Sequence, residues 1–396
     1  MTGFRVGPVL AARFIERPNR FVVRCRVPRR GVVTAFLPNP GRLWELLFPG
    51  ATLYLTDDGA AGEGGTRRTR YTAVAVERDG MPVFLHTHLN NALARHLIEA
   101  GWLDALKSAE LVRAEVSPAA HGPGPRSRFD FLLRENGAEV YLEVKSCTLF
   151  GGEVAMFPDA VTERGRRHLL ELARLAEGGT RCAVLFLVHA PHVRWFMPDY
   201  HTDLAFSRTL LDVRRRVRIL AAAVGFRVEG DGLRLAGAPR TVPIPWAYVD
   251  REARDAGSYL LILELRRRAR IAVGGLGDLA FDPGYYVYVG SATRNLAARV
   301  ARHVRVRKTC RWHIDYLRRH AAGCVPVPIR SSRRDEGALV DALADVFEPG
   351  PAGFGASDST RPTHLLKSRE NPLDLPAFHA ALQRFRMRPP DIAAES

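Results

Sequence analysis

The chain has 396 residues, of which 46% are apolar and 25% charged, as is typical of a globular protein with room for two or three domains. No apolar run approaches the length of about 18 residues that a membrane span needs, and the N-terminus lacks an apolar signal segment, so we expect a cytoplasmic protein without a membrane partner. The net charge of +16 favours a polyanionic partner, first of all nucleic acid, although an arginine-rich composition accounts for part of the excess.

Residues 1–86 predict a small β-barrel. Four β-rich runs are separated by Pro- and Gly-rich turns, with no long helix among them: residues 20–27, 31–36, 51–55 and 70–76. Basic and aromatic side chains also gather in this segment. The candidates for a nucleic-acid-binding face are Arg17, Arg20, Phe21 and Arg42. A solvated sheet face with ordinary core aromatics explains the same residues equally well.

Residues 87–235 predict an α/β domain that opens with a helix. Apolar residues recur from Leu93 to Leu103 at spacings of four, three and three, so the helix should start near Asn90, a plausible capping residue. Gly101 inside this pattern disfavours helix at the far end.

Two strands then carry the candidate chemistry. Residues 128–133 and 140–145 are both β-rich, and the Asn-Gly pair at 136–137 is typical of a hairpin turn. Period-two alternation places Glu143 and Lys145 on one face of the second strand, and Asp130 lies across the ladder.

These three side chains are the minimum for metal-dependent phosphodiester hydrolysis. The two carboxylates are hard oxygen ligands suited to Mg²⁺ or Mn²⁺, and Lys145 can orient water and offset developing charge. The five cysteines form no CxxC pair, which argues against zinc. Strands with a few charges are common, so the spacing alone is a weak signal. The apolar alternation of Val140, Leu142 and Val144 strengthens it, because charges beside a core are costly unless they are paired or hold a metal.

Residues 162–177 predict the next helix, with Leu169, Leu172 and Ala173 on its apolar stripe. The basic side chains of this helix that lie off the stripe are candidates for phosphate binding: Arg164, Arg167 and His168. The alternative is that they form an ordinary solvated helix face.

Buried strands at 182–188 and 193–196 complete an α/β order. The Gly- and Pro-rich residues 236–256 predict a linker to a third domain at 257–390.

The first part of the chain resembles the SfsA (sugar fermentation stimulation protein) family. The motifs that carry the resemblance, in order over about 230 residues, are Arg17 to Phe21, Leu37 to Leu43, Ser127 to Leu133, Glu143 to Leu149, Phe157 to Gly165 and His168-Leu169. The resemblance implies an OB-like barrel followed by a PD-(D/E)XK nuclease-like domain that binds DNA. It also implies Asp130, Glu143 and Lys145 as the catalytic trio, with Arg128 beside them on the DNA-binding face.

The C-terminal part resembles GIY-YIG endonucleases of the Uri type, an α+β fold. The matching segments are Gly257-Ser258-Tyr259, Tyr288-Val289-Gly290, Arg299 to His303, Trp312 to Leu317, Gly353 to Asp358 and His364-Leu365. The resemblance implies that Tyr259 and Tyr288 orient or activate water. Arg299 would stabilise phosphate charge, with His303 on the same helix face, and Glu336 would ligate Mg²⁺.

This copy departs from the family at three positions that usually hold cysteine: Gly337, Ser359 and Arg361. Catalysis in the third domain therefore stays open.

Three hypotheses remain for the multidomain chain. It is a metal-dependent DNA endonuclease, a catalytically silent DNA-binding regulator of sugar metabolism, or a sugar-metabolism factor. The clustered carboxylates favour the first, and no sugar-phosphate motif supports the third. The oligomeric state stays open.

Overall fold

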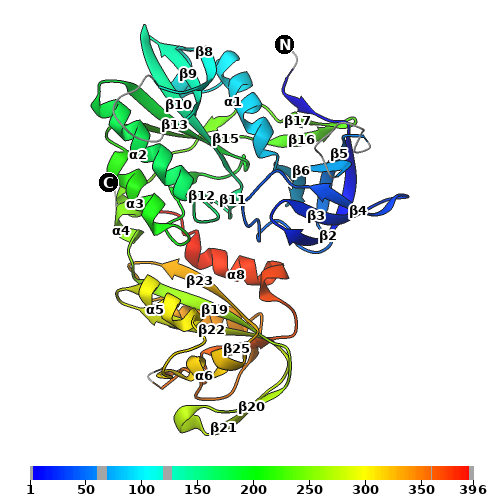
Figure 1. Ribbon diagram of the computed structural model, residues 1–396, viewed down its shortest axis with the longest axis vertical. Coiled ribbons are helices and arrows are strands. Elements are labelled where there is room, and N and C mark those ends of the chain that lie inside the picture. Colours follow the sequence, from blue (N-terminus) through cyan, green and yellow to red (C-terminus); the bar gives the residue numbers. More distant parts are fainter. Residues whose placement is uncertain (1–2, 60–68, 119–126, 358, 392–396) are drawn as a thin grey trace. The chain divides into compact units, whose positions relative to one another are not determined.

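The computed structural model describes residues 3–59, 69–118, 127–357 and 359–391 (Figure 1). Contacts within the chain define two compact units. The first comprises Met1–Asp199, Ala205–Trp246 and Pro389–Ser396, and the second comprises Tyr200–Leu204 and Ala247–Arg388. Within the described residues, no helix is long and apolar enough to cross a membrane.

The first unit begins with a barrel, as predicted. Its strands lie in the order β4-β3-β2-β5-β6-β7, and a parallel pairing of β4 with β6 closes the sheet on itself. Their bounds are β2 (Val9–Asn19), β3 (Val22–Val27), β4 (Gly31–Phe36), β5 (Thr52–Asp57), β6 (Tyr71–Arg78) and β7 (Met81–Phe84). The longest strand, β2, was not predicted, because the charged residues Arg13, Glu16 and Arg17 interrupt its apolar pattern.

The α/β part of this unit is built on a six-stranded sheet of order β18-β15-β13-β10-β9-β8. The strands are β8 (Ala109–Val116), β9 (Phe129–Glu135), β10 (Ala138–Cys147), β13 (Arg181–Val188), β15 (Arg218–Ala223) and β18 (Arg240–Thr241). Strands β10, β13 and β15 are parallel, while β9 and β10 form the predicted hairpin. Asn136 and Gly137 both have positive φ, as a tight two-residue hairpin turn requires.

Helices cover both faces of this sheet. Helix α1 (Asn90–Glu99) packs Leu93 and Leu97 onto the face that includes Leu142, whereas α2 (Glu163–Glu177) and α3 (Leu204–Val213) pack on the other. Helix α1 begins at the expected residue, but Leu89 occupies its N-cap position and Asn90 is not a cap. Thr162 does cap α2, through a hydrogen bond from the backbone N–H of Gly165.

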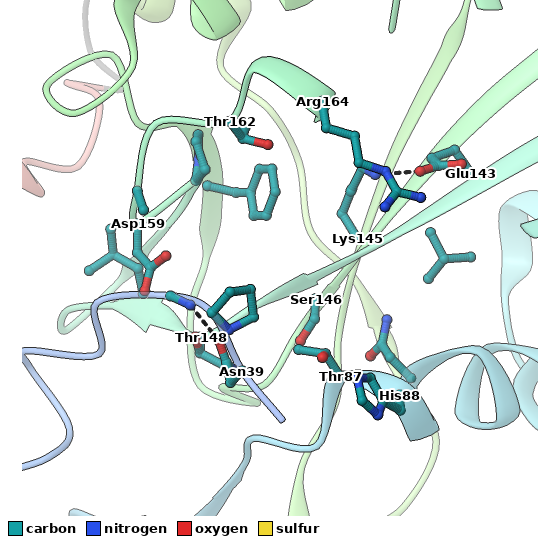
Figure 2. Close-up of a pocket in the computed structure, with 18 of the residues that line it drawn as sticks. Asn39, Thr87, His88, Glu143, Lys145, Ser146, Thr148, Asp159, Thr162 and Arg164 are labelled. Atoms are coloured by element: carbon teal, nitrogen blue, oxygen red, sulfur yellow. Dashed lines mark hydrogen bonds and ion pairs between the residues drawn. The ribbon is translucent and has the colours of Figure 1, made fainter. Parts of the chain in front are cut away.

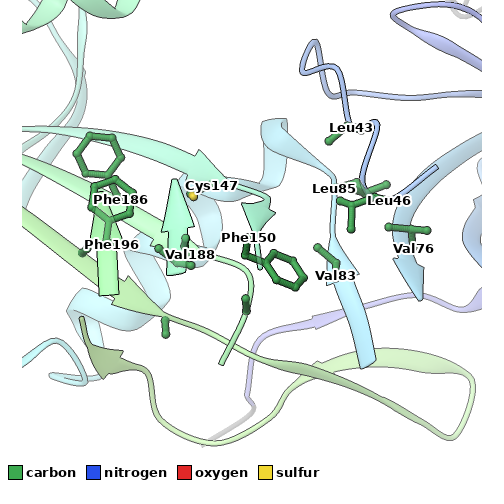
Figure 3. Close-up of a cluster of buried hydrophobic side chains, with 14 of the residues drawn as sticks. Leu43, Leu46, Val76, Val83, Leu85, Cys147, Phe150, Phe186, Val188 and Phe196 are labelled. Atoms are coloured by element: carbon green, nitrogen blue, oxygen red, sulfur yellow. The ribbon is translucent and has the colours of Figure 1, made fainter. Parts of the chain in front are cut away.

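One continuous apolar core joins the barrel to the α/β part. Leu43 and Val83 of the barrel belong to the same buried cluster as Cys147, Phe186 and Phe196 of the α/β part (Figure 3). The barrel is therefore held rigidly against the sheet that carries the candidate site.

Two small sheets complete the unit. Strands β11 (Leu149–Phe150), β12 (Val154–Phe157) and β14 (Trp195–Pro198) form one, and β1 (Arg5–Val6), β17 (Gly232–Leu235) and β16 (Phe226–Glu229) form the other.

The predicted linker at 236–256 has regular structure. Within it β18 pairs with β15, Val242 is buried in the first unit's core, and α4 (Trp246–Glu252) is helical. Its Gly and Pro residues supply turns between these short elements.

The second unit is an antiparallel sheet of order β23-β19-β22-β25-β24. Its strands are β19 (Gly257–Leu265), β22 (Gly284–Ala292), β23 (Gly323–Arg330), β24 (Glu348–Pro349) and β25 (Leu365–Ser368), with a separate hairpin of β20 (Ala269–Ala272) and β21 (Asp278–Phe281). Alternate residues of β19 enter two different cores. Tyr259 and Leu261 face α5 (Leu296–Val304) and α6 (His313–His320), whereas Leu260 and Ile262 face α7 (Glu336–Ala344) and α8 (Pro376–Arg386).

Candidate functional site

A polar pocket of about 690 Å³ lies where the barrel meets the α/β sheet. The barrel contributes Arg20 and the loop at Asn39–Gly41, and the sheet contributes Asp130 and residues 143–146. Figure 2 shows Glu143, Lys145 and Arg164 together on one wall, with Asp159 and Thr162 on another. The pocket thus brings together side chains that are far apart in the sequence.

Asp130 lies at the start of β9, where the backbone ladder with β10 has ended. Its Oδ2 accepts a hydrogen bond from the backbone N–H of Val144 at 2.7 Å, and its Oδ1 accepts one from Asn91 Nδ2 at 2.7 Å. Burial, followed by the nearby charge of Glu143, raises the pKa of Asp130 to about 6. A cation at this position would favour the ionised carboxylate.

Glu143 is buried, with 4% of its surface exposed, and one of its oxygens carries all its contacts. Its Oε1 accepts from Lys145 Nζ and lies 2.6 Å from His168 Nδ1. Burial alone would raise the pKa of Glu143, but the hydrogen bonds from His168 and Lys145 outweigh it and the pKa is lowered. Its Oε2 is buried and has no hydrogen-bond partner among the described residues, which is costly unless a ligand fills the gap.

His168 supports Glu143, a role that differs from the predicted phosphate contact. Its ring is buried beneath α2, with Nδ1 on Glu143 and Nε2 3.4 Å from Arg164 Nε. Because the arginine can only donate, Nε2 accepts and the proton lies on Nδ1. Arg164 is exposed and lines the pocket, whereas Arg167 is exposed but is not among the lining residues.

Asp159 is a pocket residue that the sequence motifs contained but that was given no role. Its Oδ2 accepts from the backbone N–H of Leu43 at 3.2 Å, its backbone carbonyl accepts from Arg42 Nε, and burial raises its pKa to about 6. A Cβ on Gly41 would collide with the Asp159 carboxylate, so only glycine fits there. The two motifs Leu37 to Leu43 and Phe157 to Gly165 therefore meet in space. The only sign of Asp159 in the sequence was its place inside the second of these motifs.

Arg17, which was predicted to bind DNA, holds the barrel loop in this structure. Its guanidinium donates to the backbone carbonyls of Arg20, Asn39, Gly41 and Arg42 at 2.7–2.9 Å. Burial lowers its pKa.

The other predicted basic and aromatic residues lie nearer the surface. Arg20 and Phe21 are exposed, and Arg42 stacks on Trp44 with 4.4 Å between guanidinium carbon and ring centroid. Arg128 is exposed and pairs with Glu115, which itself lines the pocket.

A second cluster lies in the second unit around Tyr259. The Tyr259 hydroxyl is 3.1 Å from His303 Nε2, and His303 Nδ1 is 3.2 Å from Asp315 Oδ1. All three side chains are almost fully buried, and burial strongly raises the pKa of Tyr259 while it lowers that of His303. Asp315 was quoted in the sequence motif but was given no role.

Ser291 connects the other residues predicted for this cluster. Its hydroxyl donates to Glu336 Oε2, and its carbonyl accepts from Arg299 Nη1 at 2.7 Å. His364 Nδ1 lies 3.4 Å from Glu336 Oε1. Burial is the largest influence and raises the pKa of Glu336, but His364 and Ser291 together with Arg299 lower it overall. Tyr288 is buried on the same sheet face as Tyr259, with 6.4 Å between ring centroids.

The three positions that lack the family's cysteines form one neighbourhood. A Cβ on Gly337 would collide with the Arg361 guanidinium, which occupies the space beside this glycine. Ser359 Oγ lies 2.8 Å from His364 Nε2. Asp358 lies outside the described residues. Across the described residues, no group of three or more His, Cys, Asp or Glu side chains is arranged to hold a metal ion.

Three family models match the chain. Residues 15–85 match the SfsA N-terminal OB domain, residues 88–230 the sugar fermentation stimulation protein RE domain, and residues 258–387 a domain of unknown function, DUF123.

Among known proteins, the chain is similar to several sugar fermentation stimulation protein homologues. The one from Moorella thermoacetica is 39% identical over 222 residues, which cover 56% of this chain and 88% of that protein. The one from Methanothermobacter thermautotrophicus is 38% identical over 201 residues, or 51% of this chain and 79% of that protein.

A solved structure, Pyrococcus furiosus SfsA in complex with Ca²⁺, is 30% identical with a TM-score of 0.53 and covers 62% of this chain and 99% of its own. These matches confirm both predicted resemblances. The chain belongs to the SfsA family, with its OB and RE domains followed by a DUF123 domain of the Uri-like GIY-YIG type.

Proposed function

We propose that the protein binds DNA and hydrolyses its phosphodiester bonds as a metal-dependent endonuclease, with Asp130, Glu143 and Lys145 at the reacting centre. The observation that carries this proposal is the buried Glu143 carboxylate, which keeps one oxygen without a partner among the described residues and faces a pocket shared with Asp130. A protein that only bound DNA would gain nothing from two carboxylates beside the phosphates.

The residues present fit a hard divalent cation. Mg²⁺ commonly uses one or two carboxylates and completes its shell with water, so Asp130 and Glu143 suffice to hold it, and Mn²⁺ has similar preferences. The Ca²⁺ in the solved relative supports a hard cation in this family. When bound, the cation would supply Lewis-acid polarisation of the phosphodiester.

The remaining side chains of the pocket would bind and orient the DNA phosphates. Lys145, held by Glu143, adds positive charge where negative charge develops on the phosphoryl group. Arg164 and Arg20 line the pocket and are exposed, so they are suited to the flanking phosphates. The Asn39–Gly41 loop of the barrel also lines this pocket.

The proposal includes a second catalytic centre, in the second unit. The Tyr259 hydroxyl faces an acceptor nitrogen of His303, and Glu336 is held by Ser291 next to Arg299. This arrangement suits activation of water by Tyr259 and metal binding by Glu336.

The test separates the two centres. We compare cleavage of plasmid, single-stranded and branched DNA, with and without Mg²⁺ or Mn²⁺, by the parent, Asp130→Asn/Glu143→Gln, Glu336→Gln and the combination. Glu139→Gln, an exposed carboxylate on the same strand β10, is the matched control. Metal-dependent cleavage should fall sharply in Asp130→Asn/Glu143→Gln but not in the control.

Cleavage that survives in Asp130→Asn/Glu143→Gln and disappears in the combination would belong to the second unit. A parent that binds DNA without cutting any substrate would support the alternative of a silent DNA-binding regulator.

A further inference from the structure

Five of the nine residues that line a second concave surface of the first unit are arginines. The surface has a volume of about 420 Å³ and is separate from the carboxylate pocket. The residues that line it are Glu135, Val140, Arg181, Cys182, Arg214, Arg215, Arg216, Val217 and Arg218. None of these arginines was singled out in the sequence motifs.

The fold concentrates these charges at one place. Arg181 is the first residue of β13 and Arg218 the first residue of β15, so both stand at the amino ends of neighbouring parallel strands (Figure 1). Arg214, Arg215 and Arg216 follow directly after α3 and lead into β15.

Few carboxylates offset this charge. Arg218 Nη1 donates to Glu135 Oε1 at 3.1 Å, and Arg216 pairs with the exposed Glu177. Five guanidinium groups against these two carboxylates leave a local net charge of about +3.

Several donors remain available to a ligand. Arg215 is exposed and has no hydrogen-bond or ion-pair partner in the described part of the chain. Arg181 makes only a long contact, 3.5 Å, to the Glu135 carbonyl. Guanidinium groups of this kind bind phosphate oxygens in a bidentate manner.

The surface lies at a defined distance from the carboxylate pocket. Val140 borders it, and Lys145 of the same strand borders the carboxylate pocket. Five residues of extended strand span about 16 Å, which corresponds to roughly five base pairs along a duplex. A duplex longer than about five base pairs that is bound in the carboxylate pocket is therefore long enough to span the distance between the two places.

We propose that this arginine surface is a second DNA-binding site, which takes backbone phosphates of the duplex away from the cleavage centre. This proposal rests on the part of the proposed function that names DNA as the ligand. It does not depend on catalysis. The contacts are made to phosphates, so they add affinity and orientation without reading base sequence.

The experiment measures binding without cleavage. The full chain is titrated onto a long fluorescent duplex of about 24 base pairs in EDTA, over a series of KCl concentrations. The test variant is Arg181→Gln/Arg215→Gln, whose side chains carry little of the fold. Arg113→Gln, an exposed arginine on β8 outside both pockets, is the matched control.

On the long duplex the test variant should bind about tenfold more weakly than the parent. Its log–log salt slope should become less negative by about 0.9 for each phosphate that the variant no longer neutralises. A parent that passes this test but cuts no DNA would refute the nuclease and leave the binding site standing.

Equal affinities of parent and test variant, a loss no larger than in Arg113→Gln, or a parent that binds no duplex would each overturn the proposal. A thermal-shift titration with inorganic pyrophosphate identifies the remaining alternative. If the variant loses stabilisation by pyrophosphate but keeps its affinity for the long duplex, the surface takes small phosphates and the proposal is wrong.

Discussion

His303 Nδ1 lies 3.2 Å from Asp315 Oδ1, and this contact fixes which ring nitrogen carries the proton. A carboxylate can only accept, so Nδ1 donates and Nε2 is left as an acceptor for the Tyr259 hydroxyl. Burial is the largest influence on the pKa of Asp315 and raises it, but His303, Lys308 and Arg302 hold the pKa well below its usual range. Asp315 therefore stays ionised, and it orients the histidine from a fully buried position.

Asp315→Asn should abolish the Tyr259-dependent cleavage. The amide can donate to Nδ1, which moves the ring proton to Nε2 and leaves the Tyr259 hydroxyl without an acceptor. We expect a fall in kcat on the order of 10³, measured in the Glu143→Gln background. Lys308, with 6% of its side chain exposed, also loses a charge partner, so stability should fall by about 3–5 kcal/mol.

A loss of activity caused only by unfolding would follow the melting curve, and the assay is therefore run where the variant is folded. Asp341→Asn, an exposed carboxylate that pairs with Arg361 in the same unit, is the control. Unchanged kcat in folded Asp315→Asn would show that Asp315 does not position His303.

Asp130 predicts a specific pH dependence of stability without metal. Its folded pKa, about 6, lies above the ordinary aspartate value of 3.8, so the folded state binds the proton more tightly. Stability from this group is complete below the unfolded pKa and is lost as the pH rises through about 6.

Asp130→Asn should therefore stabilise the metal-free protein at pH 8, by roughly 1–3 kcal/mol. It should also remove the stabilisation that Mg²⁺ gives the parent. Both are read from denaturant unfolding curves at about pH 5 and pH 8, with and without Mg²⁺. Equal stability of parent and variant at high pH would contradict this account of the site.

His168 and Arg167 are neighbours on α2 with different predicted effects. His168→Ala removes a hydrogen bond to Glu143, so Mg²⁺ affinity or cleavage should fall about 10–100-fold. Arg167→Ala removes only an exposed charge and should change no more than the salt dependence of DNA binding. Metal affinity by calorimetry and DNA binding by anisotropy distinguish the two, and equal behaviour would refute the supporting role of His168.

Arg17→Ala should damage the fold more than DNA binding. The substitution leaves four backbone carbonyls of the barrel loop without their donor, so we expect a loss of about 2–4 kcal/mol. Arg20→Ala, three residues away and exposed, should cost little stability and weaken DNA binding instead. A stable Arg17→Ala with weakened DNA binding would restore the direct phosphate contact predicted from the sequence.

The sequence predicted the contacts of the candidate site correctly where residues that are close in the sequence also contact each other in the fold. The alternation in β10 and the Asn-Gly turn were enough to bring Glu143 and Lys145 together and to place Asp130 on the adjoining strand. It could not tell that His168 turns inward while Arg167 turns outward, because both fall off the apolar stripe and only the buried Glu143 distinguishes them. Arg17 and Asp159 depend on contacts across 22 to 117 residues, which no local period encodes.

The last prediction concerns the end of the first unit. A fragment that ends at Leu235 lacks β18, Val242 and Trp246, although Val242 is buried in the first unit's core and Trp246 packs against it. A fragment that ends at Trp246 keeps them and should be more stable by about 2–4 kcal/mol, since burial of one large apolar side chain contributes about 1.5–3 kcal/mol. Urea unfolding of both fragments measures the difference. Val242→Ala in the longer fragment should reproduce part of the destabilisation, whereas equal midpoints for the two fragments would mean that residues 236–246 are the free linker predicted from their Gly and Pro content.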